Sequence, residues 1–345
     1  MPSILITGGT GYIGSHTAIE IIQQGRFDVV SVDNYQNSSP AALDRIEAIT
    51  GVRMKNYDID ACDLTALEGV FAAHPDIEGV IHFAALKAVG ESVEKPLLYY
   101  QNNLNSLANI LLCCEKFDVP HMIFSSSCTV YGEIDELPVT EATPTTQAES
   151  PYGNTKLIGE RMIQDFVKVT PGLQAVALRY FNPVGAHESG LNGEDPLNKP
   201  NNLLPIITRV ASGLIPQLTV YGGDYPTRDG TCIRDYIHVT DLALAHIKAL
   251  DYLREGRNEA AYEQFNLGAG EGVSVLEAIR AFEEYTGQKL NYVIGDRRPG
   301  DVTAIYSDSS LAAERLGWVA ERGIEEMMRS SWKWQETLNQ AREAT

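Results

Sequence analysis

The sequence is poor in cysteine, and its few cysteines form no recognisable framework. The five are Cys62, Cys113, Cys114, Cys128 and Cys232, and none of them belongs to a CxxC pair. An odd number without such spacing argues against a domain that is held together by disulfides. We therefore expect free thiols in a reducing compartment, and the cytoplasm is the expected location.

Long hydrophobic runs are missing as well. No uninterrupted apolar stretch reaches the roughly 18 residues that a membrane-spanning helix needs. The chain passes from Met1-Pro2-Ser3 directly into a strand pattern, which leaves no room for a signal peptide. We therefore expect no membrane span and no membrane partner.

Positive charge is scarce. The chain carries 27 Lys and Arg residues against 46 Asp and Glu residues, a formal net charge of −19. A phosphate backbone needs a basic face, so nucleic acid is not an expected partner. An anionic ligand would have to be bound by a few well-placed arginines. The seven histidines show no HxH or HExxH spacing, so no metal site is expected.

What the chain does contain is a regular alternation of strand and helix patterns over its first half. Strands are expected at 4–6, 29–33, 54–58, 79–85, 121–126 and 173–180, and helices at 41–50, 64–73, 97–117 and 151–168. Asp63 is the expected N-cap of the helix at 64–73, and Pro151 the first residue of the helix it opens. This alternation predicts an α/β fold with a doubly wound parallel sheet, whose ligands lie at the carboxyl ends of the strands.

The first strand runs into a glycine-rich turn. Ile4-Leu5-Ile6 is followed by Thr7-Gly8-Gly9-Thr10-Gly11-Tyr12-Ile13-Gly14, which has the spacing GxxGxxG. Gly8, Gly11 and Gly14 suit a tight turn, a close approach of backbone to ligand and a helix packed hard on its strand. The amino end of the helix that follows favours a pyrophosphate.

An acidic residue completes this fingerprint. Asp33 ends the second strand pattern roughly 20 residues beyond the turn, where a carboxylate binds the ribose hydroxyls of NAD and repels the extra phosphate of NADP. Ser15 stands where a P-loop needs its lysine, which argues against that motif. The alternatives are a glycine turn that serves packing only and an Asp33 that caps the next loop. We favour NAD as the cofactor.

The composition of the sequence changes at Asn182. Gly, Pro and Asn are frequent from there to Asp229, and later amphipathic helices are expected at 242–254, 275–286 and 324–334. With 345 residues the chain exceeds one typical core. We predict a Rossmann-like dinucleotide-binding domain over 1–182, to which the chain returns around 230–262, and a smaller, mixed α/β C-terminal substrate lobe over 183–345.

Three residues suggest the chemistry. Tyr152 and Lys156 are four residues apart on one helical face, and a serine cluster that includes Ser127 ends the fifth strand pattern. Serine and tyrosine beside a nicotinamide can relay a proton from a carbinol, and a nearby ammonium favours the tyrosinate. A lone YxxxK is common in structural helices, but here it follows a dinucleotide fingerprint.

At this point the sequence resembles a known family. The residues that carry the resemblance are Gly8 to Gly14, Phe83 to Ser92, Ser125-Ser126-Ser127, Tyr152 with Lys156, Arg179 to Ala186 and Arg234 to Val239. They look like the UDP-glucose 4-epimerase family of extended short-chain dehydrogenases/reductases, over essentially the whole chain. The resemblance implies transient oxidation of the sugar at C4 by a tightly bound, recycled NAD, with Tyr152, Ser127 and Lys156 as catalytic residues. The 4-keto sugar rotates before the hydrogen returns to its other face.

The resemblance also implies the binding residues. Besides the catalytic three, the cofactor would contact Gly8, Gly11, Tyr12, Ile13, Gly14, Asp33, Asn34, Asn37, Ser38, Asp60, Ala61, Phe83, Ala84, Ala85, Lys87, Asn102 and Phe181. The UDP-sugar would contact Lys87, Ser127, Tyr152, Asn182, Asn202, Leu203, Thr219, Tyr221, Arg234, Val275, Arg298, Asp301 and Ile305. Arg234 and Arg298 would clamp the diphosphate, because a guanidinium pairs with two phosphate oxygens at once.

Two positions stay open. The adenine-contacting acid is Asp60 by preference, but a shift of the alignment by two residues would make it Asp58. Ile305 falls where related epimerases carry either a bulky tyrosine or a small residue that leaves space for an N-acetyl group. Isoleucine lies between the two, so an epimerase that accepts or prefers UDP-N-acetylhexosamines is an alternative.

Other functions are weighed against the same residues. A nucleotide-sugar dehydratase usually has an Asp-Glu pair directly after the catalytic serine or threonine, and here Cys128-Thr129 follows Ser127. Another nucleotide-sugar oxidoreductase of the fold stays open. A cofactor-sensing binding protein would typically lose one of the three catalytic groups, and all three are present. A homodimer through 97–117 and 151–168 is expected from the family.

Overall fold

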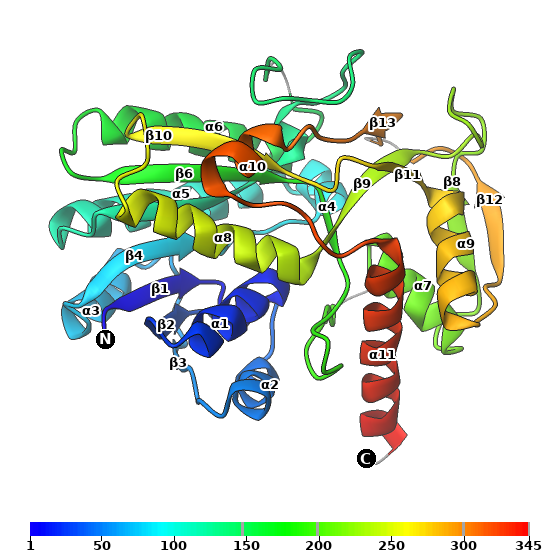
Figure 1. Ribbon diagram of the computed structural model, residues 1–345, viewed down its shortest axis with the longest axis horizontal. Helices are drawn as coiled ribbons and strands as arrows, with labels where there is room; N and C mark the ends of the chain where they lie inside the picture. Colours follow the sequence, from blue (N-terminus) through cyan, green and yellow to red (C-terminus); the bar gives the residue numbers. More distant parts are fainter. Residues whose placement is uncertain (146–147, 198–199, 299–300, 344–345) are drawn as a thin grey trace.

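A large parallel sheet dominates the computed structural model, which describes residues 1–145, 148–197, 200–298 and 301–343 (Figure 1). Its seven strands lie in the order β3-β2-β1-β4-β5-β6-β10, and every neighbouring pair is parallel. The strands are β1 (Ser3–Thr7), β2 (Asp28–Val32), β3 (Lys55–Tyr57), β4 (Ile77–His82), β5 (His121–Ser127), β6 (Gln174–Tyr180) and β10 (Tyr262–Leu267). The predicted doubly wound α/β fold is confirmed.

Helices cover both faces of this sheet. One face packs on α1 (Tyr12–Gln24), α2 (Ala41–Thr50), α8 (Val239–Arg254) and α10 (Ser310–Leu316), and the other on α3 (Leu64–Ala73), α5 (Pro96–Lys116) and α6 (Pro151–Val167). Side chains alternate along a strand, so Ile4 and Ile6 join the first core and Leu5 the second. The expected N-cap is confirmed, since the Asp63 carboxylate accepts from the amide of Ala66 at 3.0 Å.

The switch point of the sheet lies between β1 and β4. The chain runs outward from β1 to β3 and then returns to build β4, β5 and β6 on the other side. Open sheets of this order bind ligands in a crevice outside the carboxyl ends of the strands at the switch point. The short helices α4 (Val89–Glu94) and η1 (Cys128–Val130) follow β4 and β5 at this edge.

The second lobe is smaller and its sheets are mixed. Strand β9 (Ile233–His238) pairs in parallel with β7 (Asn182–Val184) and β13 (Ala304–Ile305), and antiparallel with β11 (Gly272–Ser274). A separate parallel pair joins β8 (Leu218–Tyr221) to β12 (Tyr292–Gly295). Helices α7 (Leu203–Ala211), α9 (Val275–Thr286) and α11 (Ile324–Glu343) share its core. The predicted mixed α/β character is confirmed.

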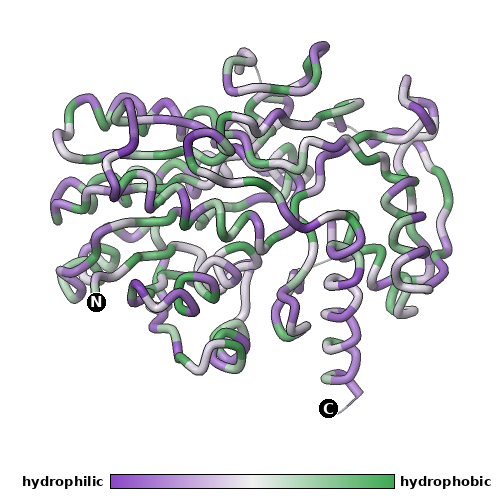
Figure 2. Tube along the Cα trace, viewed as in Figure 1, coloured by the Kyte–Doolittle hydropathy of each residue, from purple (hydrophilic) through white to green (hydrophobic). Residues whose placement is uncertain are grey.

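Segments from the second half of the chain also join the large sheet. Strand β10 pairs with β6 and forms the edge of the sheet opposite β3, and α8 packs alongside α1 on one face of the sheet (Figure 1). Helix α11 ends in a hydrophilic stretch at the C-terminus (Figure 2). No helix in the described part of the chain is long and apolar enough to cross a membrane.

Candidate functional site

The glycine turn lies at the switch point and has no room for side chains. Gly8 has a φ of +74°, and a Cβ there would stand 3.0 Å from the amide nitrogen of Ala84 in the loop after β4. A Cβ on Gly14 would stand 2.1 Å from the carbonyl oxygen of Gly8, so α1 packs directly on the turn. Gly11 is the N-cap of α1 and has no side chain to bond the first amides, which start at Tyr12 and Ile13. This cradle fits a pyrophosphate.

Asp33 lies beside the turn, directly after β2. Its carboxylate accepts from the amides of Thr10 at 3.1 Å and Tyr35 at 3.0 Å, and from the hydroxyl of Ser38 at 2.8 Å. Asp33 therefore does cap the next loop, as the alternative interpretation proposed. The same bonds fix the carboxylate at the edge of the turn, where a ribose would be bound. Predicted contacts Asn34 and Asn37 lie in this loop.

The remaining predicted cofactor residues come from three parts of the fold. Phe83, Ala84 and Ala85 directly follow β4, and the amides of Phe83 and Ala84 donate to Thr7 O. Ala61 is buried, and its carbonyl accepts from the side chain of Asn109 on α5, which also carries Asn102. Asp58 and Asp60 are both exposed after β3, so the structure does not choose between them.

The serine, tyrosine and lysine meet at the end of β5. Ser127 is the last residue of β5, and Tyr152 and Lys156 are one turn apart on α6, whose first residue is Pro151 as predicted. All three are buried, with 4 to 8% of each residue exposed. The Lys156 ammonium donates to the carbonyl of Ser125 at 2.6 Å and lies 5.9 Å from the centre of the Tyr152 ring.

The protonation of this cluster is governed by burial. Burial raises the pKa of Tyr152 well above that of a free phenol, and the nearby phenol of Tyr180 raises it further, while a hydrogen bond with Ser127 lowers it. Burial also lowers the pKa of Lys156 to about 8, and the carboxylate of Glu160 opposes that shift. Burial therefore opposes the tyrosinate that Lys156 and the positive charge of an oxidised nicotinamide are predicted to favour.

Four predicted substrate residues come together in the second lobe. Arg298 donates to Asp301 through Nε, at 3.1 Å from Oδ2, and through Nη2, at 2.8 Å from Oδ1. The Arg298 guanidinium lies 5.5 Å from the centre of the Tyr221 ring. Arg234 on β9 lies 3.6 Å from the same Asp301 oxygen. Two cations share one anion here, so the group keeps a net positive charge that suits a diphosphate.

Other predicted contacts lie on further elements of the second lobe. Asn182 begins β7, Thr219 lies on β8, Leu203 begins α7 and Val275 begins α9. Ile305 is the Cα partner of Arg234 on β13 and packs with Phe181 and Cys128 in one apolar cluster. Ile305 therefore belongs to the same apolar cluster as the residue that follows Ser127.

One residue of this region was missed from the sequence. The Glu194 carboxylate accepts from the Lys87 ammonium at 3.1 Å and from the Asn202 amide at 2.9 Å, so it joins two predicted binding residues from different lobes. Its backbone carbonyl accepts from the indole of Trp334 on α11. Glu194 lies in an irregular Gly- and Pro-rich stretch, where no periodicity indicates which side chain turns inward.

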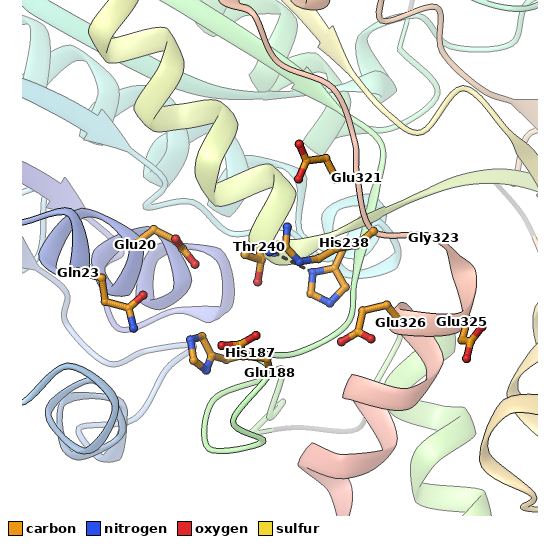
Figure 3. A pocket seen from close by; sticks show the side chains of 11 residues that line it. Glu20, Gln23, His187, Glu188, His238, Thr240, Glu321, Gly323, Glu325 and Glu326 are labelled. Atoms are coloured by element: carbon orange, nitrogen blue, oxygen red, sulfur yellow. Dashed lines mark hydrogen bonds between the residues drawn. The ribbon is translucent and has the colours of Figure 1, made fainter.

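One cavity is separate from these residues. It measures about 830 Å³ and is lined by residues of α1, the starts of α8 and α11, and the loop at 187–188 (Figure 3). None of the predicted ligand-binding residues lines it. Its walls include Glu20, Glu188, Glu321, Glu325 and Glu326. Among the described residues, no group of three or more His, Cys, Asp or Glu side chains is arranged to hold a metal ion.

Comparisons with known proteins cover nearly the whole chain. Residues 5–331 match the family described as GDP-mannose 4,6 dehydratase. The chain is 50% identical to the UDP-glucose 4-epimerase of Pasteurella multocida, over 96% of this chain and 97% of that protein. It is 51% identical to a solved UDP-glucose 4-epimerase from Bifidobacterium longum in complex with NAD+ and UDP, with a TM-score of 0.93 over 97% of this chain and 98% of that one. A Stenotrophomonas maltophila UDP-glucose-4-epimerase with bound NAD and formylated UDP-arabinopyranose is 44% identical, with a TM-score of 0.94 over 99% of this chain and all (100%) of that chain.

Proposed function

This chain belongs to the UDP-glucose 4-epimerase family of extended short-chain dehydrogenases/reductases, and we propose that it interconverts UDP-glucose and UDP-galactose in galactose metabolism. One observation carries the proposal. Ser127, Tyr152 and Lys156 form a buried cluster at the same sheet edge as the glycine turn. A proton relay and a dinucleotide cradle are thus joined in one crevice.

The crevice fits NAD. The turn excludes side chains at Gly8 and Gly14, and Asp33 presents a fixed carboxylate at its edge. NAD bound there would supply a reversible acceptor for the hydride at C4 of the sugar, while the hydroxyl proton goes to the protein. The residues proposed to hold it are those of the turn, Asp33 to Ser38, Asp60 and Ala61, Phe83 to Ala85, Lys87, Asn102 and Phe181, with Ser127, Tyr152 and Lys156.

The protein groups have separate tasks in this proposal. Tyr152 takes the proton of the sugar 4-hydroxyl and later gives it back. Ser127, which bonds Tyr152, holds the sugar oxygen during the transfer. The Lys156 ammonium faces the Tyr152 ring and is the cation of the chain that favours loss of the phenol proton.

The second lobe holds the nucleotide half of the substrate. We propose that residues 1–182, with the return around 230–262, bind NAD, and that residues 183–345 bind UDP. Arg234 and Arg298 clamp the diphosphate, and Tyr221, Thr219, Asn182, Asn202, Leu203, Val275 and Asp301 line the uridine and sugar side. Firm contacts on UDP and few on the sugar leave the 4-keto intermediate free to rotate.

The test of this function is an assay without added cofactor. Purified protein is incubated with UDP-galactose, and UDP-glucose is measured. Conversion without added NAD is expected, together with nicotinamide that co-purifies with the protein. Purified protein that holds no nicotinamide, or that forms no UDP-glucose, would overturn the proposal.

Acceptance of N-acetylated substrates is the second candidate function. Ile305 is 4% exposed and packs against Phe181, so this side chain occupies space beside the catalytic serine. The same assay with UDP-N-acetylgalactosamine decides whether isoleucine leaves room for the acetyl group. We expect the Ile305→Ala variant to accept that sugar better than the parent protein does.

We further propose a homodimer in the cytoplasm. Helices α4 and α5 expose Val93 (61%), Leu97 (72%) and Leu112 (44%), an apolar face that a second copy would cover through 97–117 and 151–168. All five cysteines are free thiols, as a reducing compartment requires. Sedimentation of Leu97→Glu tests the dimer, because a charge within this apolar face should yield monomers.

A further inference from the structure

A second cluster of three side chains lies directly behind the catalytic cluster. Two members neighbour a proposed catalytic residue: Ser126 precedes Ser127 on β5, and Glu160 lies one helical turn beyond Lys156 on α6. Arg179 on β6 is the Cα partner of Ser126. The three residues are 0, 2 and 5% exposed.

These three side chains are tightly bonded to one another. Arg179 Nε donates to Glu160 Oε1 at 2.9 Å and Nη2 donates to Oε2 at 2.6 Å, a two-pronged ion pair. The Ser126 hydroxyl donates to Glu160 Oε1 at 2.5 Å. Arg179 also donates to the Tyr131 hydroxyl at 3.1 Å. The carboxylate therefore joins α6 to β5 and β6, the two strands on which α6 lies (Figure 1).

This network continues into the contact that holds Lys156. The ammonium of Lys156 donates to the carbonyl of Ser125, the residue bonded covalently to Ser126. Glu160 thus fixes Ser126 on one side of the peptide while Lys156 fixes Ser125 on the other. A shift of α6 along β5 would have to break both contacts. The two contacts therefore both fix the distance from Ser127 to Tyr152 and Lys156 on α6.

The same carboxylate is the acid that acts on Lys156. Residues at i and i+4 of a helix are neighbours, with about 5–6 Å between their Cβ atoms. Lys156 is buried, which disfavours its charged form, and Glu160 counters this. Phe124 adds a ring whose centre lies 5.0 Å from the ammonium.

The other titratable groups around Lys156 carry no charge at neutral pH. Burial lowers the pKa of His82 on β4 to about 3, and raises that of Cys128 and of Tyr180 to about 12. Burial also raises the pKa of Tyr99 on α5, which lies with Tyr152 in one apolar cluster. Glu91 on α4 is bonded to Tyr99 and to Lys95 at the surface.

We propose that Ser126, Glu160 and Arg179 form a positioning network that keeps the Lys156 ammonium charged and in register with Ser127 and Tyr152. The proposal rests on the proposed function, because only that function requires a charged Lys156. None of the three touches substrate or cofactor in it. They act on the reaction only through the charge and position of Lys156 and through the position of Ser127 at the end of β5.

The test measures Lys156 directly and uses the NAD-loaded protein. Lysine labelled at Cε with ¹³C is followed by NMR against pH, and the Lys156 signal is assigned by its loss in Lys156→Met. Glu160→Gln leaves Arg179 unpaired, whereas the double variant Glu160→Gln, Arg179→Met removes both charges and keeps the volume. Replacing a buried ion pair by neutral groups is often tolerated. Asp165→Asn, an acid on the exposed side of α6, is the matched control.

We expect the proton affinity of Lys156 to fall in both variants. It should fall about tenfold in Glu160→Gln and by less in the double variant. No change is expected in the control. The value of kcat should fall in the double variant while KM for UDP-galactose stays within about twofold, because UDP is bound elsewhere.

Two outcomes would overturn the proposal. One is a Lys156 titration in the double variant that coincides with that of the parent protein. The other is a double variant that does not fold, which would assign the network to stability alone. Parent protein that binds NAD but does not epimerise UDP-galactose refutes the proposed function instead, and the NMR titration still reports on the network.

Discussion

The proposed catalytic cluster and the proposed arginine clamp are built in different ways. Ser127, Tyr152 and Lys156 are buried and belong to one strand and one helix that pack together. Arg234, Arg298 and Asp301 come from a strand and a loop of the second lobe, and the Arg298 side chain is 49% exposed. Proton transfer requires hydrogen-bond distances, whereas a diphosphate can be held by flexible guanidinium groups. The demands of each task explain how rigidly each group is held.

The strongest test of this contrast is removal of the phenol oxygen. Tyr152→Phe should lower kcat by about 10² to 10⁴-fold, because the proton relay loses its acid and base. Bound NAD and the melting temperature should be close to those of the parent protein, since the ring stays in its buried site. Activity within tenfold of the parent, measured as UDP-glucose formed, would show that another group carries the proton.

A methyl group in the turn should separate binding from chemistry. In Gly14→Ala the new Cβ would stand 2.1 Å from the Gly8 carbonyl, so α1 must shift off the turn. We expect loss of co-purifying nicotinamide and a drop in unfolding free energy of about 1–3 kcal/mol. Gly69→Ala on α3 is the control, because nothing lies within 4 Å of its Cβ position. Equal NAD content in both variants would contradict the proposed cradle.

The clamp should act on substrate binding alone. Arg298→Ala removes a charge-assisted contact worth about 1.5–3 kcal/mol, so KM for UDP-galactose should rise about 10- to 150-fold with little change in kcat. Arg297→Ala removes the adjacent arginine, which pairs with Asp224 and not with Asp301, and should leave KM unchanged. If Arg298→Ala lowered kcat and left KM unchanged, Arg298 would act in the chemical step instead of in substrate binding.

Acid should weaken the lobe of the large sheet. Burial lowers the pKa of His16, His121 and His246 to about 4 and of His82 to about 3, and all four pack around that sheet. Below about pH 6.5 the histidines of the unfolded chain bind protons, and those of the folded chain do not. Their contribution to the free energy of unfolding is therefore fully present above pH 6.5 and is lost as the pH falls toward about 4.

Each of these histidines should lower the free energy of unfolding by about 2 kcal/mol at pH 5, compared with neutral pH. The measurement is the melting temperature at pH 7.5 and pH 5. In His82→Gln, which keeps a polar partner for Thr7, the difference should shrink. A melting temperature that is the same at both pH values would show that the buried histidines titrate in the folded chain.

The sequence predicted most of the first lobe because its signals are local. The glycine turn, the acid at Asp33 and the YxxxK helix each lie within one element or its end, so spacing alone placed them. Asp63 and Pro151 were likewise found at the helix starts that the pattern predicted. The binding roles of the individual residues remain predictions.

The pattern could not place residues whose partners come from distant parts of the chain. Glu194 meets Lys87 across 107 residues, and Glu160 meets Arg179 through the pairing of two strands with a helix. A lowered pKa for Tyr152 was expected from its charged neighbour, but burial raises it. Exposure to solvent is a property of the packed molecule, and no spacing rule reports it.

By itself the sequence determined the doubly wound sheet, its glycine turn and the order of the catalytic residues, because hydrophobic periodicity and glycine placement act over a few residues. Only the tertiary structure decided which charges share a site: Asp301 between two arginines, Glu194 between two lobes, and Glu160 behind Lys156. Electrostatic energies depend on distance and burial, and both arise only when the elements pack.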